Sequence, residues 1–280
     1  EPVLAAAVDA GAHYLDTTGE QPFIRLAFEG YGRRAEKAGV AVLPAMGYDY
    51  VPADLLVALT ARGVDPIDRI RIGYHSPFQP SRGTARSSLE MFKGGDLEWR
   101  DGTLRPAPQK VSRPAFDFGP PLGRKRMMRF PSGEHLTVPR HLAVRSIETS
   151  MSADSILPTR IAGLMPLLAR PAGLAMRTPA RAAISRMISL MPEGAGPEGR
   201  TSTRFAIACE VTSPTARRRG HLTGTDVYGL TAALIVKGAI AAARGEIEPT
   251  GALAPAEAFD PAGFLSGLDR FELEWAVDPE

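Results

Sequence analysis

The feature that most constrains the fold is a short, wholly apolar run, 40-VAVLP-44, which leads into a polar loop containing glycine. Such runs are typical of strands buried on both faces of a parallel sheet. Helical patterns flank this run at 22–38 and 53–62, and an earlier strand pattern at 13–16 follows a helical pattern at 2–11. This α-β-α-β-α order predicts right-handed crossovers and a doubly wound sheet.

We expect this sheet to be incomplete within the sequence. Two parallel strands are too few for a doubly wound sheet. The order begins with a helix, and the chain starts with Glu1 and Pro2 rather than with methionine. The sequence therefore predicts that the preceding strands lie upstream of residue 1.

The pattern changes at about residue 69, where apolar and polar residues begin to alternate. Alternation is typical of antiparallel strands with one solvated face, and the Asp-Gly pair in 97-LEWRDGTLR-105 is a hairpin signal. Residues 224–245 form a helical pattern that ends at a glycine, and the Pro-rich residues 106–122 are interpreted as a long connection. Further strands are predicted at 69–75, 142–152, 203–213 and 271–277.

The predicted fold class is α/β. Residues 1–68 are interpreted as the C-terminal part of a Rossmann doubly wound domain, and 69–280 as an α+β domain with a mostly antiparallel sheet. Within it, 155–192 contains five arginines, several methionines and no acidic residue. Prolines divide this stretch into short helical pieces. It is either a helical cap packed on the sheet, or a lid over an apolar substrate or a patch that touches an anionic membrane.

Composition narrows the function classes. The chain has 280 residues, 44% of them hydrophobic, and 33 basic against 31 acidic residues give a net charge of +2, which does not favour nucleic acid. The single cysteine, Cys209, lies in an apolar strand and is interpreted as a core thiol in a reducing compartment. No apolar run approaches the roughly 18 residues of a spanning helix. We expect a cytoplasmic protein, with membrane association as an open alternative.

Several other motifs in the sequence do not indicate a functional site. The sequence 194-GAGPEG-199 matches a phosphate-binding glycine pattern, but no strand precedes it and no helix follows it, so we interpret it as a loop. The basic clusters 124-RKRMMR-129 and 217-RRR-219 lack aromatic interleaving and are interpreted as solvated turns. The histidines show no metal-ligand spacing. Asp101 and Glu134 have no evident partner for paired-carboxylate chemistry.

Two polar loops at the predicted strand ends carry the candidate site. The loop 16-DTTGE-20 follows the first strand, and 46-MGYDY-50 follows the second. The carboxyl ends of parallel strands are where α/β proteins bind dinucleotides. We therefore expect Asp16, Glu20, Gly47 and Asp49 to lie close together. Asp54, in the first turn of the next helix, is interpreted as a helix cap.

With these loops in view, the sequence resembles the saccharopine dehydrogenase-like oxidoreductases. The residues that carry the resemblance are 11-GAHYLDTTGE-20 and 39-GVAVLPAMGYDYVPADL-55. Weaker support comes from 82-RGTARSSLEMF-92, 226-DVYGLTAALIVKGAIAA-242 and 251-GALAPAEAFDPAGFLSGL-268. The resemblance implies a nicotinamide-dinucleotide fold followed by a substrate and dimerisation domain. One branch acts on amino-acid adducts, and another is similar to trans-acting enoyl reductases that serve polyketide lipids.

The resemblance also implies roles for individual residues. The nicotinamide end of NAD or NADP is expected to lie beside Asp16, Thr17, Thr18, Gly19 and Glu20, with Gly47 in the floor of the crevice. Tyr48 and Asp49 are the candidate catalytic residues; Tyr48 or Tyr14 could donate a proton, but a packed aromatic is the favoured role for each. Tyr14, Thr84 and Arg86 are candidate substrate-binding residues. The family's glycine-rich turn is expected upstream, so this chain alone is predicted to be inactive.

Expectations about partners follow from the same resemblance. The expected reaction is hydride transfer to or from a carbonyl, imine or enoyl substrate, and the acid-free stretch favours a lipid-like enoyl thioester. The expected assembly is a homodimer formed through the sheet. The alternative is a catalytically inactive binding or scaffold protein of the same fold at a membrane or lipid surface.

Overall fold

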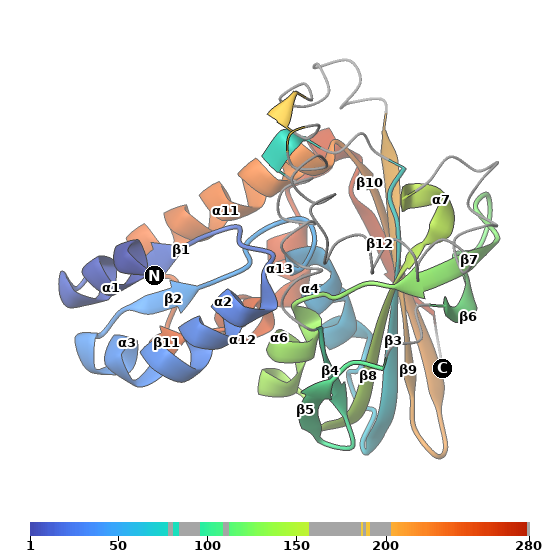
Figure 1. Ribbon diagram of the computed structural model, residues 1–280, viewed down its shortest axis with the longest axis horizontal. Helices are drawn as coiled ribbons and strands as arrows, with labels where there is room; N and C mark the ends of the chain where they lie inside the picture. The colour runs from blue at the N-terminus through green and yellow to red at the C-terminus, as the bar shows by residue number, and fades with distance from the viewer. Residues whose placement is uncertain are drawn as a thin grey trace.

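The computed structural model describes residues 1–77, 81–83, 96–108, 112–156, 186, 189–190 and 203–278. They form a small parallel sheet and a larger, mostly antiparallel sheet with helices around both (Figure 1). The mixed α/β class predicted from the sequence is confirmed at this level. The division of the chain at residue 68 stays a prediction.

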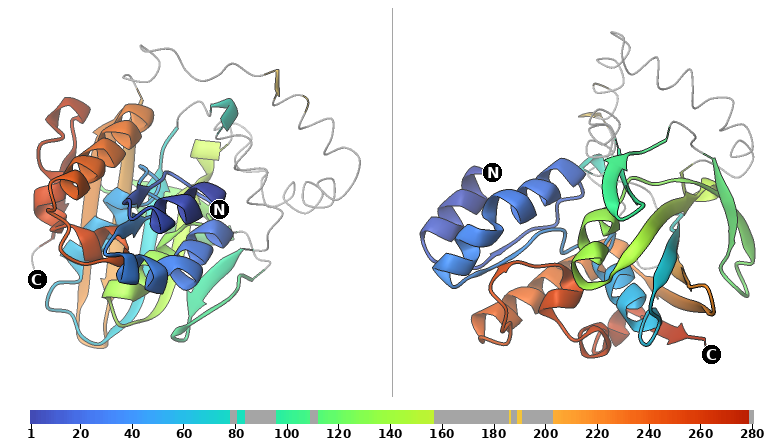
Figure 2. Two further views of the ribbon diagram at one scale, coloured as in Figure 1. Left: turned by 90° about the vertical axis from the view of Figure 1, so that its left-hand side faces the viewer. Right: turned by 90° about the horizontal axis from the view of Figure 1, so that it is seen from below.

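The small sheet has three parallel strands in the order β1-β2-β11: β1 (Tyr14–Leu15), β2 (Ala41–Leu43) and β11 (Gly251–Ala252). Strand β2 lies in the centre and is wholly buried, as its apolar run predicts. Figure 2 shows α1 (Pro2–Asp9) and α3 (Gly32–Ala38) on one side of this sheet and α11 (Val227–Ala243) on the other. Strand β11 is not predicted from the sequence, because two residues are too few to show an alternation of apolar and polar side chains.

The predicted helix at 22–38 is divided in the structure. It consists of α2 (Gln21–Leu26), a π-helical segment η1 (Ala27–Tyr31) and α3. Gly39 ends α3 in the left-handed conformation, with φ of 68°, as a C-terminal glycine is expected to do. Because β1 and β2 are parallel, the loop after β1 and the loop after β2 both leave the carboxyl ends of the strands.

The large sheet has seven strands in the order β12-β10-β9-β3-β8-β7-β6. Only the β3–β8 pair is parallel. A separate hairpin turns at Asp101-Gly102, both with positive φ, as that pair predicts. The large-sheet strands are β3 (Ile67–His75), β6 (Ser112–Asp117), β7 (Arg124–Arg129), β8 (Val144–Ser152), β9 (Arg204–Thr212), β10 (Arg217–Thr225) and β12 (Glu274–Val277), and the hairpin strands are β4 (Leu97–Arg100) and β5 (Thr103–Pro106).

Three interpretations of the sequence are wrong here. The Pro-rich stretch 106–122 contains strand β6, which tolerates Pro114 because β6 lies at the edge of the sheet and its register shifts between Arg113 and Phe116. The cluster 124–129 is strand β7, not a turn, and its two methionines are buried. The cluster 217–219 begins β10, where two of its arginines bind the buried Glu210.

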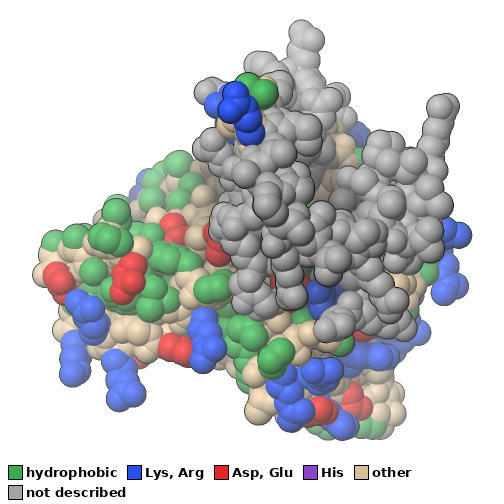
Figure 3. All heavy atoms as spheres, in the orientation of Figure 1, with side chains coloured by type: hydrophobic (Ala, Val, Ile, Leu, Met, Phe, Trp, Pro, Cys, Tyr) green, Lys and Arg blue, Asp and Glu red, His purple; other side chains and the backbone are tan. Residues whose placement is uncertain are grey.

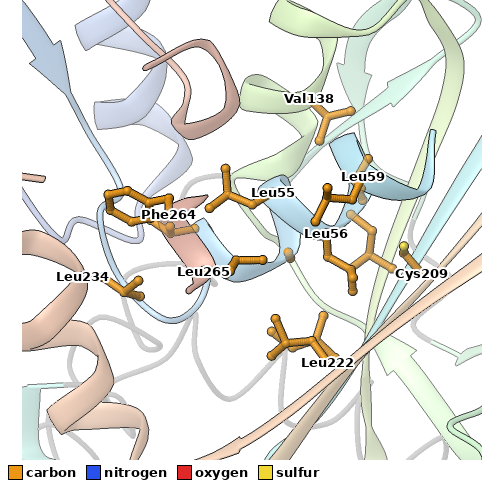
Figure 4. Packing of buried hydrophobic residues seen from close by; sticks show 14 of the residues in the cluster. Leu55, Leu56, Leu59, Val138, Cys209, Leu222, Leu234, Phe264 and Leu265 are labelled. Carbon is orange, nitrogen blue, oxygen red and sulfur yellow. The ribbon is translucent and has the colours of Figure 1, made fainter. Parts of the chain in front are cut away.

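Helix α4 (Val51–Thr60) is central to the core. It packs against β9 and β10 of the large sheet and against α6 (Glu134–His141) and α13 (Pro261–Leu265). Figure 4 shows its leucines among Cys209 and Leu222 of the sheet and Phe264 of α13. Burial of Cys209 confirms the core-thiol prediction. The remaining short helices are α7 (Ala153–Ile156), α12 (Pro255–Ala258) and η3 (Asp269–Phe271).

Candidate functional site

The structure brings the two strand-end loops together at the carboxyl ends of β1 and β2. The backbone N–H of Met46 donates to the carbonyl oxygen of Asp16 at 2.7 Å. One carboxylate oxygen of Asp16 accepts from the backbone N–H of Thr18 at 2.8 Å and from that of Ala45 at 3.3 Å. The expectation that these loops are neighbours is confirmed, while the roles assigned to their residues stay predictions.

Backbone strain lies at the same place. Ala45 has φ of 62°, in the left-handed region that a non-glycine residue rarely adopts. The bond from its N–H to Asp16 holds this conformation. Residues held in sparsely populated conformations tend to occur at ligand-binding and catalytic sites. The turn after β2 therefore has the backbone character of a functional loop.

Glu20 organises the first loop internally. Its carboxylate accepts from the hydroxyl of Thr18 at 2.8 Å and from the backbone N–H of Gly19 at 3.1 Å. The hydroxyl of Tyr50 donates to the carbonyl oxygen of Gly19 at 2.7 Å, which ties this loop to the second one. Glu20 and Tyr50 thus hold the shape of the site.

Gly47 lies where the second loop meets α11. A Cβ atom built on Gly47 would lie 3.7 Å from Thr231 and 3.9 Å from Thr17, which is ordinary contact. The hydroxyl of Thr231 accepts from the backbone N–H of Tyr48 at 3.1 Å. The N-terminus of α11 is fixed in turn by Asp226, which accepts from the N–H of Gly229 at 2.9 Å. Helix α11 therefore supports the turn after β2.

Tyr48 has a buried hydroxyl with the hydroxyl of Ser76 beside it. Its ring packs edge-on against Phe205 and Tyr74, with centroids 4.6 and 6.4 Å away. Among the described residues, the hydroxyl of Tyr48, the Oγ of Ser76 and the Oδ2 of Asp16 are buried without a hydrogen bond of ordinary geometry, although Tyr14 also lies beside the Asp16 carboxylate. Burial raises the pKa of Tyr48, so its phenol stays protonated at neutral pH. Buried polar groups normally have partners, so these three call for an explanation.

Asp49 follows Tyr48 and is partly exposed. Burial raises the pKa of its carboxyl group to about 6. No residue in the described part of the chain donates a hydrogen bond to this carboxylate. A carboxyl group that titrates close to neutral pH is suited to general acid–base chemistry.

The remaining candidates divide in two. Tyr14 lies on β1, where burial and the Asp16 carboxylate raise its pKa to about 12. Burial also raises the pKa of Asp16. Thr84 and Arg86 lie outside the described residues, as do most of 155–192 and the whole of 194–199.

The prediction that Asp54 caps its own helix is wrong. Its fully buried carboxylate makes no cap bond in α4. It accepts from the backbone N–H of Ala256, in the first turn of α12, at 2.9 Å. It also lies 3.1 Å from the ring nitrogen of His141 at the end of α6. Asp54 therefore joins three helices behind the site, a role that depends on contacts distant in sequence.

Sequence reasoning missed a group of buried polar residues behind the second loop. The hydroxyl of Tyr74 on β3 donates to the carbonyl oxygen of Asp49 at 2.5 Å and also contacts the carboxyl group of Glu134. Ser132 contacts the other oxygen of Glu134. Burial raises the pKa of Glu134 to about 8. The Ser-x-Glu spacing at 132–134 is visible in the sequence, but the partner 60 residues away is not.

In the described ranges, no helix is long and apolar enough to cross a membrane. Nor do these ranges contain a group of His, Cys, Asp and Glu side chains that could hold a metal ion.

No protein-family model matches the chain. A Mycobacterium tuberculosis protein that is a trans-acting enoyl reductase by name is 26% identical over 240 residues, covering 84% of this chain and 51% of that protein. An Arabidopsis thaliana protein, by name a mitochondrial saccharopine dehydrogenase-like oxidoreductase, is 33% identical over 93 residues, or 33% of this chain and 18% of its own. The saccharopine dehydrogenase-like oxidoreductase of Bos taurus is 37% identical over 60 residues, which cover 21% of this chain and 14% of that protein.

Among solved structures, a Clostridium difficile dehydrogenase aligns with 96% of this chain and 74% of its own at a TM-score of 0.31 and 9% identity, a likeness too low to support an argument. The sequence matches agree with the resemblance carried by the strand-end motifs. The chain spans about half the length of the mycobacterial relative and less of the others. It is a distant homologue of the saccharopine dehydrogenase-like oxidoreductases and trans-acting enoyl reductases.

Proposed function

We propose that the protein is an NAD(P)-dependent oxidoreductase that transfers a hydride between the nicotinamide and a carbonyl, imine or enoyl group. The observation that carries this proposal is the meeting of two polar loops at the carboxyl ends of adjacent parallel strands. Distant homology over most of the chain supports it. A lipid-like enoyl thioester is the favoured substrate, because the apolar stretch 155–192 contains no acidic residue and the mycobacterial relative is an enoyl reductase by name.

The residues present fit the nicotinamide end of such a cofactor. The Asp16 carboxylate, which lies beside the hydroxyl of Tyr14, would accept a hydrogen bond from an amide or ribose hydroxyl. When bound, the cofactor supplies or accepts the hydride. The described residues contain no glycine-rich turn that would hold the pyrophosphate, so the proposal concerns the nicotinamide half alone.

Two residues would handle the proton that accompanies the hydride. Tyr48 keeps its phenolic proton, and among the described residues the hydroxyl of Ser76 lies beside it, so the phenol would donate a hydrogen bond to a substrate oxygen that replaces this contact. Asp49 has a pKa of about 6 and partial exposure, so it would exchange a proton with solvent near neutral pH. Their adjacent positions place both functions on one turn.

Because this chain alone is predicted to be inactive, the test uses protein that includes the upstream segment implied by the resemblance, and it measures oxidation of NADH and NADPH in the presence of a trans-2-enoyl thioester, a ketone and an imine, one at a time. Asp49→Asn and Tyr48→Phe are each expected to lower kcat/KM about 10²–10⁴-fold, the usual contribution of general acid–base catalysis. Glu29→Gln, at an exposed residue that pairs with Arg25, is the control and is expected to leave kcat/KM unchanged. No oxidation with any acceptor, or full activity in both variants, would contradict the proposal.

A second candidate function is a catalytically inactive scaffold at a lipid surface. Helix α11 exposes Val236 and Ile240 to 54% and 46%, beside an open groove of about 760 Å³ lined mostly by apolar residues. Hydrophobic side chains gather over the part of the molecule that carries α1 and α11 (Figure 3). A Caenorhabditis elegans relative, 42% identical over 55 residues, is named a lipid droplet localized protein, and the match covers 20% of this chain and 13% of that one.

Flotation with triacylglycerol droplets coated in phosphatidylcholine separates the two functions. A scaffold would float with the droplets, and the double variant Val236→Glu and Ile240→Glu would abolish flotation. An enzyme without this surface role would remain in the bottom fraction and would keep its nicotinamide oxidation. The second candidate fails if wild-type protein does not float.

A further inference from the structure

Glu134 lies at the start of α6 with its side chain fully buried. Its two carboxyl oxygens contact two hydroxyl groups, those of Tyr74 and Ser132. In the part of the chain that the structure describes, Glu134 takes part in no salt bridge. An ionised carboxylate in this position would therefore be buried without a cation, which is costly.

The charged groups around Glu134 provide no compensation. On α6 itself, His135 turns to Thr149 and the backbone of Trp99, and burial lowers its pKa to about 3, so it is neutral. Arg140 binds Glu257, and His141 faces Asp54. From the facing elements, Asp54 is an anion whose charge also disfavours ionisation of Glu134. His75 on β3 turns away to Ser152.

A count of protons at Tyr74 decides the state of Glu134. The Tyr74 hydroxyl has one hydrogen and lies between the carbonyl oxygen of Asp49, at 2.5 Å, and a carboxyl oxygen of Glu134. The carbonyl can only accept. If Glu134 were ionised and accepted the hydrogen bond of Tyr74, the Tyr74 hydroxyl oxygen and the Asp49 carbonyl oxygen would stand 2.5 Å apart with no hydrogen between them. If Glu134 carries a proton, it donates to Tyr74, Tyr74 donates to Asp49, and every contact is satisfied.

The same cluster holds the candidate site from behind. The carbonyl that Tyr74 binds belongs to Asp49, in the turn that presents Tyr48 and Asp49. Beside Glu134, Gly133 packs so closely on Tyr50 and Ile24 that an added Cβ would lie 3.0 Å from each. Tyr50 in turn donates to Gly19 in the first loop. Both strand-end loops are therefore attached to the start of α6.

We propose that Glu134 is a neutral carboxylic acid in the folded protein and that its proton positions the turn bearing Asp49. Glu134 is a positioning residue that acts through Tyr74, and it does not touch the substrate. The raised pKa of Glu134, due first to burial, agrees with this state. The proton assignment is independent of the reaction, whereas the positioning role rests on the proposed function.

The first test compares the stability of wild type and Glu134→Gln by urea unfolding from pH 5 to 8. The amide keeps the shape and the donor to Tyr74 but does not titrate. A neutral Glu134 predicts that the folding equilibrium constant of wild type, relative to the variant, falls about tenfold per pH unit between roughly pH 5 and 7.5. The control Glu29→Gln is expected to run parallel to wild type. Parallel curves for wild type and Glu134→Gln would overturn the proposal.

A second measurement needs no variant at Glu134. In protein labelled with ¹³C at glutamate carboxyl carbons, one resonance is expected to titrate above pH 7. The proposal is wrong if all of them titrate below pH 6, even where Glu134→Gln fails to fold.

The positioning role has its own readout, the pH profile of kcat/KM. Wild type is expected to lose activity above about pH 8 as Glu134 ionises, and Glu134→Gln is expected to lack this alkaline loss. An identical loss in the variant would refute positioning. Absence of nicotinamide oxidation in both proteins would refute the proposed function, while the carboxyl resonance would still report the proton.

Discussion

Replacing Asp54 by alanine should destabilise the protein strongly, because this carboxylate joins α4 to two other helices. The side chain is fully buried and accepts from the N–H of Ala256 at 2.9 Å, with His141 at 3.1 Å. Its removal leaves a buried backbone donor and a buried imidazole without their partner. Removing one member of a buried pair costs about 3–5 kcal/mol. At about 2–4 °C per kcal/mol for a protein of this size, the melting temperature should fall by roughly 6–20 °C.

The pH dependence of the same variant gives a sharper test. Burial lowers the pKa of His141, but the Asp54 charge and hydrogen bond more than offset this and raise it above its usual value near 6.5. The stabilisation from this pair is therefore complete below about pH 6.5 and is lost as pH rises through the folded-state pKa. Urea unfolding of wild type and Asp54→Ala should show a difference that shrinks between pH 6 and 9.

Two further variants complete this experiment. Asp54→Asn retains an acceptor without the charge, so its loss should be smaller than that of Asp54→Ala, and it should also shrink as pH rises because the raised pKa of His141 depends on the Asp54 charge. Asp9→Asn breaks an exposed pair with Arg34 and should cost at most about 1 kcal/mol. A loss below about 1 kcal/mol for Asp54→Ala, or a difference that does not change with pH, would refute the reasoning.

Four other outcomes are expected. Gly220→Ala should cost about 1–3 kcal/mol in urea unfolding, because the new Cβ would lie 2.2 Å from the hydroxyl of Thr60 in the core; an unchanged midpoint would contradict this packing. Burial raises the pKa of Cys209 to about 12, so a thiol reagent at pH 8 should label it only at the rate of unfolding, and rapid labelling of native protein would contradict this. Burial alone would raise the pKa of Glu210, but hydrogen bonds from two arginines of β10 and nearby positive charge lower it. The stability advantage of wild type over Glu210→Gln should therefore be lost below about pH 4.5. A stability difference that persists there would be evidence against this network of ion pairs. Light scattering should give the mass of a homodimer, and a monomer would refute the expected self-association.

The sequence predicted the elements whose pattern is local. The apolar run at 40–44 is a wholly buried parallel strand, and the Asp-Gly pair at 101–102 is a hairpin turn. Gly39 ends a helix in the left-handed conformation. In each case the signal lies within a few residues, and tertiary packing agrees with it.

Where contacts between distant residues decide the structure, the sequence predicted less. Strand β7 has six residues with four cations, and it forms because its two methionines are buried and it pairs with strands on both sides. Strand β11 joins the small sheet from more than 200 residues away. The candidate site shows the same limit: the two loops were predicted as neighbours, but Glu134 and Tyr74 behind them depend on a contact across 60 residues.

The most direct test of the account is titration of ¹⁵N-labelled protein with NADH and NADPH, followed by backbone amide shifts. We predict weak binding, on the order of millimolar, because the proposed function assigns only the nicotinamide half of the cofactor to these loops. The amides of Thr17, Gly19 and Gly47 should shift together and saturate with one dissociation constant. Shifts confined to the groove along α11, or no shift at 10-fold higher concentrations (on the order of tens of millimolar), would contradict the placement of the cofactor at these strand ends.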